Sequence, residues 1–185
     1  LQALTASIDA KDRYTFGHSE RVGLLGSQLA LEAGLGGQIA ERYRIAGLIH
    51  DVGKIGVPEA VLTKPGHLSA SEFTQIKNHP VIGHRILKDI PTLSDVLPGV
   101  LYHHERWDGQ GYPKGLTGQD IPLIGRILCV ADTYDAIYFV FHPHEVWSGD
   151  DPTPTNFSAN LSVFKDVYYI TYWPLTNADV KADGI

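Results

Sequence analysis

The sequence contains no methionine, not even at position 1, and its single cysteine is Cys129. One cysteine excludes an internal disulfide, which is compatible with a reducing cytosol. No apolar run approaches the roughly 20 residues that a membrane-spanning helix needs, and no signal peptide opens the chain. We therefore expect a cytoplasmic location without membrane insertion. The missing methionine predicts that these 185 residues are a fragment of a longer protein.

Basic side chains are also scarce. The chain has 15 lysines and arginines against 21 aspartates and glutamates, which gives a formal net charge of −6. Binding to a nucleic-acid polymer needs a basic face, so this balance argues against such a partner. A small anionic substrate remains compatible with the sequence, because bound metal ions can supply a local positive charge.

Residues 1–137 show the pattern of helices joined by short polar turns. Between positions 19 and 35, apolar residues recur every three or four positions, which is helical spacing. A capping sequence begins at Ser69, and glycines and a proline predict a loop at 105–120. The fold class is therefore all-α. The predicted helical segments are 1–10, 19–35, 39–50, a turn after Pro58, 69–77, 80–87, 94–104 and 123–137.

The composition changes after Ile137. Residues 138–185 are rich in aromatic side chains and contain no arginine, and residues 163–173 have the propensity of a β-strand. We therefore predict two parts, a helical domain at 1–137 and a divergent, irregular C-terminal tail at 138–185.

Histidines and aspartates gather in the helical part. His50 is followed directly by Asp51, and His103 directly by His104. Imidazole and carboxylate ligands together suit iron, manganese or zinc, and adjacent ligands such as His50 and Asp51 can serve one ion while the carboxylate bridges to a second. A bridged pair of ions activates water and clamps the oxygens of a phosphoryl group during its transfer.

A single histidine in a helical protein is more often a surface or core residue than a ligand, and one His-Asp pair is common by chance. The combination of several histidines, a His-His pair and the late Asp132 in one small chain favours a metal site. Lys54 lies one helical turn beyond Asp51 and could neutralise a phosphate oxygen there.

Several segments resemble the signatures of the HD-GYP family. The segment after His103 includes the triplet Gly111-Tyr112-Pro113, and the long match there is not a chance pattern. The resemblance covers about residues 1–137, through segments 14–19, 50–59, 103–116 and 121–136. It implies an HD-domain helical bundle around a binuclear metal site. It also implies hydrolysis of cyclic di-GMP, a bacterial second messenger, to linear pGpG and GMP, and an upstream sensor or receiver domain as a partner.

The resemblance also implies roles for individual residues. Asp51 would bridge two divalent ions, most readily iron or manganese, and would be catalytic together with Lys54. Lys54 and the loop at Gly111, Tyr112 and Pro113 would contact the substrate. The implied metal ligands are His18, His50, Asp51, His79, His103, His104 and Asp132. Outside this set, we expect Glu105 and Asp108 to hold the loop, Asp135 to cap or orient, and His84 to be structural or to support a ligand.

Two positions depart from the family pattern. Tyr14 stands where members with three metals have a glutamate, which favours a two-metal site here. After the Tyr-Asp-Ala at 134–136 the family continues with Thr-Ser and an arginine-rich stretch that holds phosphates, whereas this chain has Tyr138 after Ile137 and no arginine from there on. A one-nucleotide frameshift would permit Thr-Ser-Ser at this point, and a truly divergent tail is the alternative. Either way we expect a weakened substrate clamp.

Three functions are compatible with these observations. The first is an active cyclic di-GMP phosphodiesterase. The second is a regulatory or binding module of the same family whose divergent tail has weakened catalysis. The third is an HD phosphohydrolase that acts on another cyclic dinucleotide or on a nucleotide.

Overall fold

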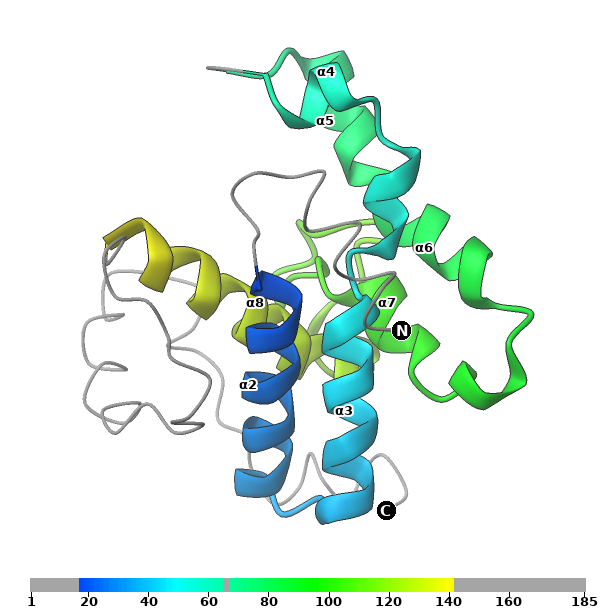
Figure 1. Cartoon of the computed structure of the whole chain (residues 1–185), viewed down its shortest axis with the longest axis vertical. Helices are drawn as coiled ribbons and strands as arrows, with labels where there is room; N and C mark the ends of the chain where they lie inside the picture. Colours follow the sequence, from blue (N-terminus) through cyan, green and yellow to red (C-terminus); the bar gives the residue numbers. More distant parts are fainter. Residues whose placement is uncertain (1–16, 65–66, 142–185) are drawn as a thin grey trace.

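The computed structural model describes residues 17–64 and 67–141, without the side chains of 138–141. These residues form helices and no strand, which confirms the all-α prediction (Figure 1). The predicted helix at 1–10 and residues 142–185 of the predicted tail lie outside the described residues, whereas residues 138–141, the first four of that tail, continue the last helix. The elements are α2 (His18–Glu32), α3 (Gly37–Ile49), the 3-10 helix η1 (Val52–Gly56), α4 (Glu59–Leu62), α5 (Ala70–Lys77), α6 (His79–Leu87), η2 (Pro91–Leu93), α7 (Leu97–Tyr102), η3 (Gly118–Asp120) and α8 (Leu123–Phe141).

Helices α2 and α3 lie side by side and touch through their backbones (Figure 1). A Cβ atom on Gly47 would lie 2.6 Å from the Cα atom of Gly23, so neither position has room for a side chain. This contact lies in the first half of α2 and near the end of α3. It therefore brings the first residue of α2, His18, close to His50 at the end of α3.

Helix α8 packs against α2 and α7 and supplies much of the apolar core. Its crossing with α7 is also close, because a Cβ atom on Gly125 would lie 3.2 Å from the carbonyl oxygen of Tyr102. This contact places the residues that follow α7 beside α8. The buried apolar side chains of α8 recur at helical spacing, at Leu123, Ile124, Ile127, Leu128, Ala131 and Tyr134.

Among the described glycines, Gly53 has the least space, where η1 meets α6. A Cβ atom on Gly53 would lie 1.8 Å from the carbonyl oxygen of His79 and 2.5 Å from the backbone nitrogen of Gly83. Only glycine fits at such a distance. Asp51 precedes η1 directly, so this contact brings its carboxylate to His79 at the start of α6.

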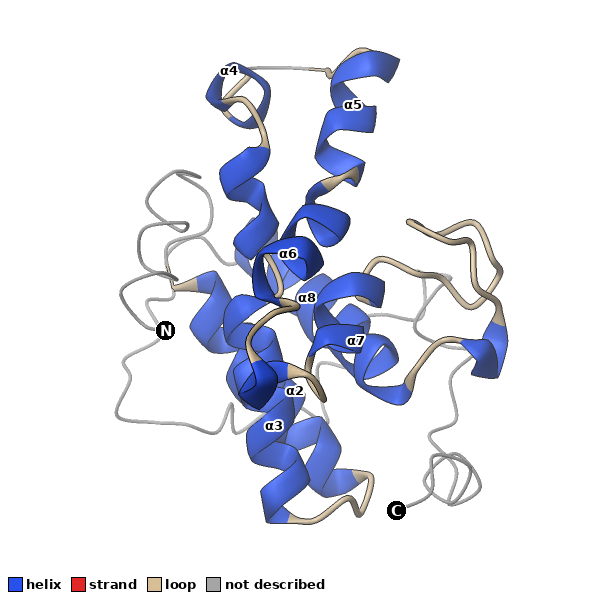
Figure 2. Cartoon of the chain, turned by 90° about the vertical axis from the view of Figure 1, so that its right-hand side faces the viewer, coloured by secondary structure: helices blue, strands red, loops and turns tan. Residues whose placement is uncertain are grey.

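Helices α4 and α5 form an arm that stands away from the other helices (Figures 1 and 2). Val61 is the only buried residue of α4, and α5 has none. The predicted cap of α5 is present: Ser69 Oγ accepts a hydrogen bond from the backbone N–H of Glu72, and the Glu72 carboxylate accepts one from the backbone N–H of Ser69. Local capping therefore stabilises α5 where packing does not.

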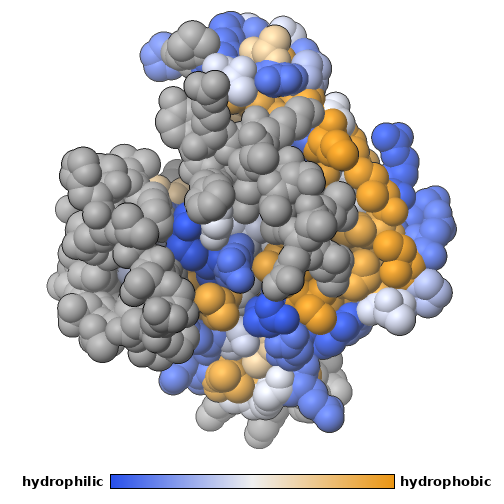
Figure 3. All heavy atoms as spheres, in the orientation of Figure 1, coloured by the Kyte–Doolittle hydropathy of each residue, from blue (hydrophilic) through white to orange (hydrophobic). Residues whose placement is uncertain are grey.

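Helix α6 is packed on one face only. Its buried face contains His79, Gly83 and Leu87, whereas Val81 and Ile86 are exposed. Figure 3 shows apolar surface gathered on the side of the molecule where Figure 1 places α6. Within the described ranges, no helix combines the length and the apolar character that crossing a membrane requires.

Candidate metal centre

The structure brings all seven predicted ligand residues into one cluster, and most of them stand where a helix begins or ends. His18 opens α2 and His79 opens α6, while His50 follows α3 and His103 follows α7. Asp132 lies within α8. The close contacts between α2 and α3, between α7 and α8, and between η1 and α6 bring these helix ends together.

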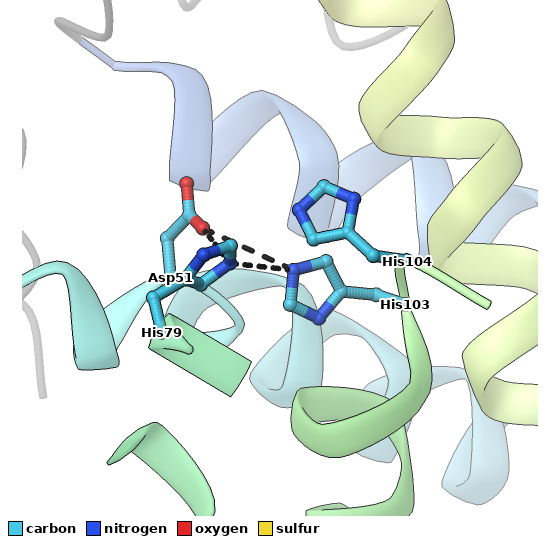
Figure 4. A group of neighbouring side chains, drawn as sticks. All are labelled: Asp51, His79, His103 and His104. Carbon is cyan, nitrogen blue, oxygen red and sulfur yellow. Dashed lines mark hydrogen bonds and ion pairs between the residues drawn. The ribbon is translucent and has the colours of Figure 1, made fainter. Parts of the chain in front are cut away.

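One group of possible ligands consists of Asp51, His79, His103 and His104, with one ligand atom from each within 4.8 Å of the others. Figure 4 shows these four side chains pointing toward one another. His79 Nε2 lies 3.1 Å from Asp51 Oδ1, and His103 Nε2 lies 3.9 Å from the same oxygen. The two imidazole nitrogens Nε2 of His79 and His103 are 3.2 Å apart.

A second group consists of His18, His50 and Asp51, so Asp51 belongs to both. His50 Nε2 lies 3.4 Å from Asp51 Oδ2, the other oxygen of this carboxylate. Asp132 joins the group from α8, with its Oδ1 atom 3.1 Å from His18 Nε2 and 4.0 Å from His50 Nε2. The carboxylate of Asp51 thus offers one oxygen to each group, which is the arrangement a bridging ligand requires.

Hydrogen bonds with the backbone fix the tautomer of three histidines. The Nδ1 atoms of His50, His79 and His103 lie 2.6, 2.8 and 2.9 Å from the carbonyl oxygens three residues earlier. A carbonyl oxygen only accepts, so each Nδ1 carries a hydrogen, and in its neutral form each ring directs the lone pair of Nε2 into the cluster.

These inward lone pairs do not satisfy one another. His50 Nε2 is buried and has no hydrogen-bond partner among the described residues. The nitrogens Nε2 of His79 and His103 face each other at 3.2 Å as two acceptors. Ligating histidines typically donate their outer N–H to a carbonyl or carboxylate, as these do. The donor set therefore fits a divalent cation.

The charge states also suit metal binding, which needs neutral imidazole and ionised carboxylate. Burial lowers the pKa of His103 well below its ordinary value, and burial lowers that of His104 to about 4. Burial alone would raise the pKa of Asp51, but the positive charge of Lys54 holds it well below its ordinary value. His103, His104 and Asp51 are therefore in the metal-binding form near neutral pH.

Lys54 lies on η1, beside the shared carboxylate. Its Nζ atom is 2.7 Å from Asp51 Oδ2. The chain does not continue α3 as a regular helix here, and the tighter η1 still places Lys54 three residues beyond Asp51 on the same side. A cation therefore borders the shared carboxylate.

Glu105 holds the loop between α7 and α8 from inside. Its buried carboxylate accepts hydrogen bonds from the backbone N–H groups of Lys114 at 2.6 Å and Leu116 at 2.9 Å. Asp108 accepts another from the backbone N–H of Gln110 at 3.0 Å. These contacts confirm that Glu105 and Asp108 hold the loop.

The Gly111-Tyr112-Pro113 triplet of this loop lies against the cluster. A Cβ atom on Gly111 would lie 2.3 Å from the backbone nitrogen of Arg106, so the chain folds back on itself there. Tyr112 stacks on His104, with ring centroids 4.7 Å apart, and its backbone N–H donates to the carbonyl oxygen of His104 at 3.1 Å. Pro113 follows Tyr112 through a cis peptide bond.

The hydroxyl of Tyr112 remains a hydrogen-bond donor. Burial, then the charges of Asp51 and Asp132, raise its pKa. Lys77 of α5 borders the same ring, with its Nζ atom 5.7 Å from the centroid of Tyr112 and 4.7 Å from that of Phe73. No ion pair joins Lys77 to an acidic side chain within the described part of the chain.

Sequence reasoning missed two contributors to this region. Lys77 had no recognisable signal except its place two residues before His79. Arg21, one turn after His18, binds Asp135, and Asp135 in turn binds His18. His84 makes no side-chain contact with the cluster among the described residues, and Tyr14 lies outside them.

Comparisons with known proteins agree with this geometry. The sequence pattern of the HD domain family matches residues 3–139. The chain is similar to a cyclic di-GMP phosphodiesterase of Thermotoga maritima, with 42% identity over 139 residues that make up 74% of this chain and 38% of that protein.

Two further relatives show the same partial match. A 3'3'-cGAMP-specific phosphodiesterase of Vibrio cholerae is 41% identical over 70% of this chain and 30% of its own length. A cyclic di-GMP phosphodiesterase response regulator of Xanthomonas campestris is 37% identical over 81% of this chain and 40% of its own length. The chain thus spans well under half the length of each relative.

Proposed function

This chain belongs to the HD domain family, in its HD-GYP type, and from that premise we propose that it is a metal-dependent phosphodiesterase that hydrolyses cyclic di-GMP. The observation that carries the proposal is the double donor set around Asp51, with one carboxylate oxygen directed to each group. We propose that the cofactors are two divalent ions, iron or manganese.

Each of the two donor groups would hold one of the two ions. His79, His103 and His104 would hold one ion and His18, His50 and Asp132 the other, with Asp51 shared. When bound, such a pair of cations activates water and offsets the charge on the phosphoryl oxygens.

Lys54 would act directly on the substrate. Its ammonium group borders Asp51 at 2.7 Å and can donate to a phosphoryl oxygen as negative charge builds there. The protonated hydroxyl of Tyr112 can donate to a second oxygen from the opposite chain segment. Because the Glu105 contacts fix the loop, Tyr112 is held in place before substrate binds.

The remote part of the substrate needs contacts of its own. The arginine-rich stretch of the family is absent from the sequence after Ile137, and that segment lies largely outside the described residues. Lys77 is the described cation that borders Tyr112 from the arm. We propose that Lys77 contacts the distal phosphate, which would partly replace the missing arginines.

A turnover assay tests the proposal. Protein loaded with Mn²⁺ should convert cyclic di-GMP to the linear dinucleotide, resolved by chromatography, and protein treated with a chelator should not. A loaded protein that holds two ions but leaves cyclic di-GMP intact would reject the proposed substrate and favour the regulatory module.

A second substrate has specific support, because one relative is named for 3'3'-cGAMP. The ring of this dinucleotide also carries two phosphodiester bonds, and the metal cluster would treat the two molecules alike. A competition assay with equal amounts of both substrates gives the ratio of their kcat/KM values. The cytoplasmic location and the upstream sensor or receiver domain remain predictions of the sequence.

A further inference from the structure

We propose that Asp135 and Arg21 are positioning residues that hold His18 in place, and that the second half of the metal centre therefore depends on the docking of α2 against α8. This inference rests on the proposed metal centre. The two donor groups differ in this respect, because local backbone carbonyls orient His79 and His103, whereas a residue of another helix orients His18.

Three contacts join α2 to Asp135. His18 Nδ1 lies 2.7 Å from Asp135 Oδ2, and Arg21 donates from Nε to Oδ1 at 2.7 Å and from Nη2 to Oδ2 at 3.0 Å. Asp135 is buried, and it lies 117 residues from His18 along the chain. A two-pronged Arg–carboxylate pair fixes the direction of the carboxylate as well as its position.

His18 differs in this respect from the other histidines whose outer nitrogen has a described partner. His50, His79 and His103 each use the backbone carbonyl three residues earlier, so short local segments fix their rings. His18 is the first residue of α2, and no earlier turn of that helix can offer such a carbonyl. Asp135, on a different helix, occupies that role.

The position of Arg21 makes this arrangement cooperative. Arg21 lies three residues after His18 on α2, so both side chains reach the same carboxylate from one helix. A shift of α2 relative to α8 would break both contacts together. The ring of His18 would then lose its orientation, and its Nε2 atom would leave Asp132 and His50.

The first donor group has no such dependence. His79 and His103 are oriented locally, and neither α2 nor α8 supplies a residue to the group formed with Asp51 and His104. Loss of the Asp135 contact should therefore weaken the binding of one ion and leave the binding of the other unchanged. If Asp135 only stabilised the fold, its loss would instead weaken the binding of both ions together.

Titration of the metal-free protein with Mn²⁺ alone tests this inference, by calorimetry and by electron paramagnetic resonance. Wild type should bind two equivalents with the signal of a coupled pair. Asp135→Asn and Arg21→Gln should weaken the second equivalent about 10–100-fold, the usual effect of removing a group that orients a ligand, and leave the first unchanged within about threefold. The coupled signal should give way to that of a single ion.

The pair Arg42 and Asp95 is the matched control. It has the same two-pronged geometry, with both contacts at 2.6 Å, but it lies on the surface and touches none of the proposed ligands. Asp95→Asn should therefore leave both equivalents unchanged. Arg21→Lys, which keeps the charge but loses the fork, should weaken the second equivalent less than Arg21→Gln does.

A His18→Ala background decides whether Asp135 acts through His18. His18→Ala alone should lose the second equivalent, and adding Asp135→Asn should cause no further loss. The inference would be overturned if Asp135→Asn weakened the binding of both ions equally, or if it left the affinity for both ions unchanged. If wild type bound fewer than two ions, the proposed metal centre itself would fail, and this result is visible before any variant is made.

Discussion

The helical body and the α4–α5 arm differ in how their residues are held. In the body, α2, α3, α7 and α8 meet through close glycine contacts and bury an apolar core. In the arm, α5 buries no residue and depends on its Ser69 cap and on the pair between Lys64 and Glu72. The proposed ligands belong to the body and to the segments packed on it, whereas Lys77 belongs to the arm.

This difference matches the different roles that we propose for the two regions, metal binding in the body and substrate contact in the arm. Metal ligands must be held to within a fraction of an ångström, which only packed elements can do. A residue that meets a flexible, charged substrate tolerates more freedom. We therefore expect body substitutions to change metal content and stability, and substitution of Lys77 in the arm to change the affinity for substrate alone.

Asp51→Ala should have the largest effect, because both donor groups contain Asp51. We expect loss of both ions and loss of turnover to the level of chelated protein. Metal analysis and a cyclic di-GMP assay check the two effects together. Asp51→Ala protein that retains two ions would disprove the shared carboxylate.

Gly53→Ala should be the most destabilising small change. The added methyl group would lie 1.8 Å from the carbonyl oxygen of His79, so η1 and α6 must separate. We expect a loss of at least ~3 kcal/mol in the free energy of unfolding, with lowered metal content. Chemical denaturation measures it.

Gly37→Ala is the control for that substitution, because no atom lies within 4 Å of its Cβ position and it opens α3. It should be neutral or stabilise by up to ~1 kcal/mol. If Gly53→Ala behaved in the same way, the close contact between η1 and α6 would not exist.

The pH dependence of stability should also separate body from arm. In the metal-free protein, burial would lower the pKa of His18, but hydrogen bonds with Asp132 and Asp135 raise it to about 10. Because this pKa exceeds the ordinary 6.5, the stabilisation is complete below pH 6.5 and is lost as the pH rises toward 10. In the arm, hydrogen bonds from Lys64 and Ser69 lower the pKa of Glu72 to about 2, so its contribution is present above pH 4.5 and is lost as the pH falls toward 2.

Denaturation of metal-free protein at several pH values measures both effects. His18→Gln should remove the alkaline loss, and Glu72→Gln should change only the acid side. An alkaline loss of the same size in His18→Gln protein would show that another group is responsible.

Lys77→Gln should have a smaller and more specific effect. We expect kcat/KM for cyclic di-GMP to fall about tenfold, equivalent to ~1.4 kcal/mol, because one contact to the distal phosphate is lost. Metal content and stability should not change. Hydrolysis of bis(p-nitrophenyl) phosphate, which has no second phosphate, should be unaffected.

The exposed Lys88 at the end of α6 provides the control, since Lys88→Gln removes one charge from a different surface. Equal losses in the two variants would mean that general electrostatic attraction, rather than a contact by Lys77, explains the effect.

Much of the body could be predicted from the sequence. Helical spacing and caps located α2, α3, α5, α6 and α8 to within a few residues, because these signals are local. The predicted helix at 94–104 is shorter, since Pro91 opens η2 and Pro98 lies in the first turn of α7. Proline at these positions starts a new helix rather than continuing one.

The proposed ligands of the site could be predicted from the sequence, but the residues that hold them in position could not. The family signatures pointed to the ligands, and the structure brings them together. The contacts of Arg21 with Asp135 and of Lys77 with Tyr112 join residues far apart in the chain, and no local pattern reports such pairs. The same holds for Gly53, whose need for glycine comes from α6 rather than from its own turn.

The most direct test of the account is a crystal structure of Mn²⁺-loaded protein with anomalous scattering. We predict two peaks, one among Asp51, His79, His103 and His104, and one among His18, His50, Asp51 and Asp132, with a different oxygen of Asp51 on each. A single peak, or two peaks of which one lies away from Asp51, would contradict the shared carboxylate on which the proposed function depends.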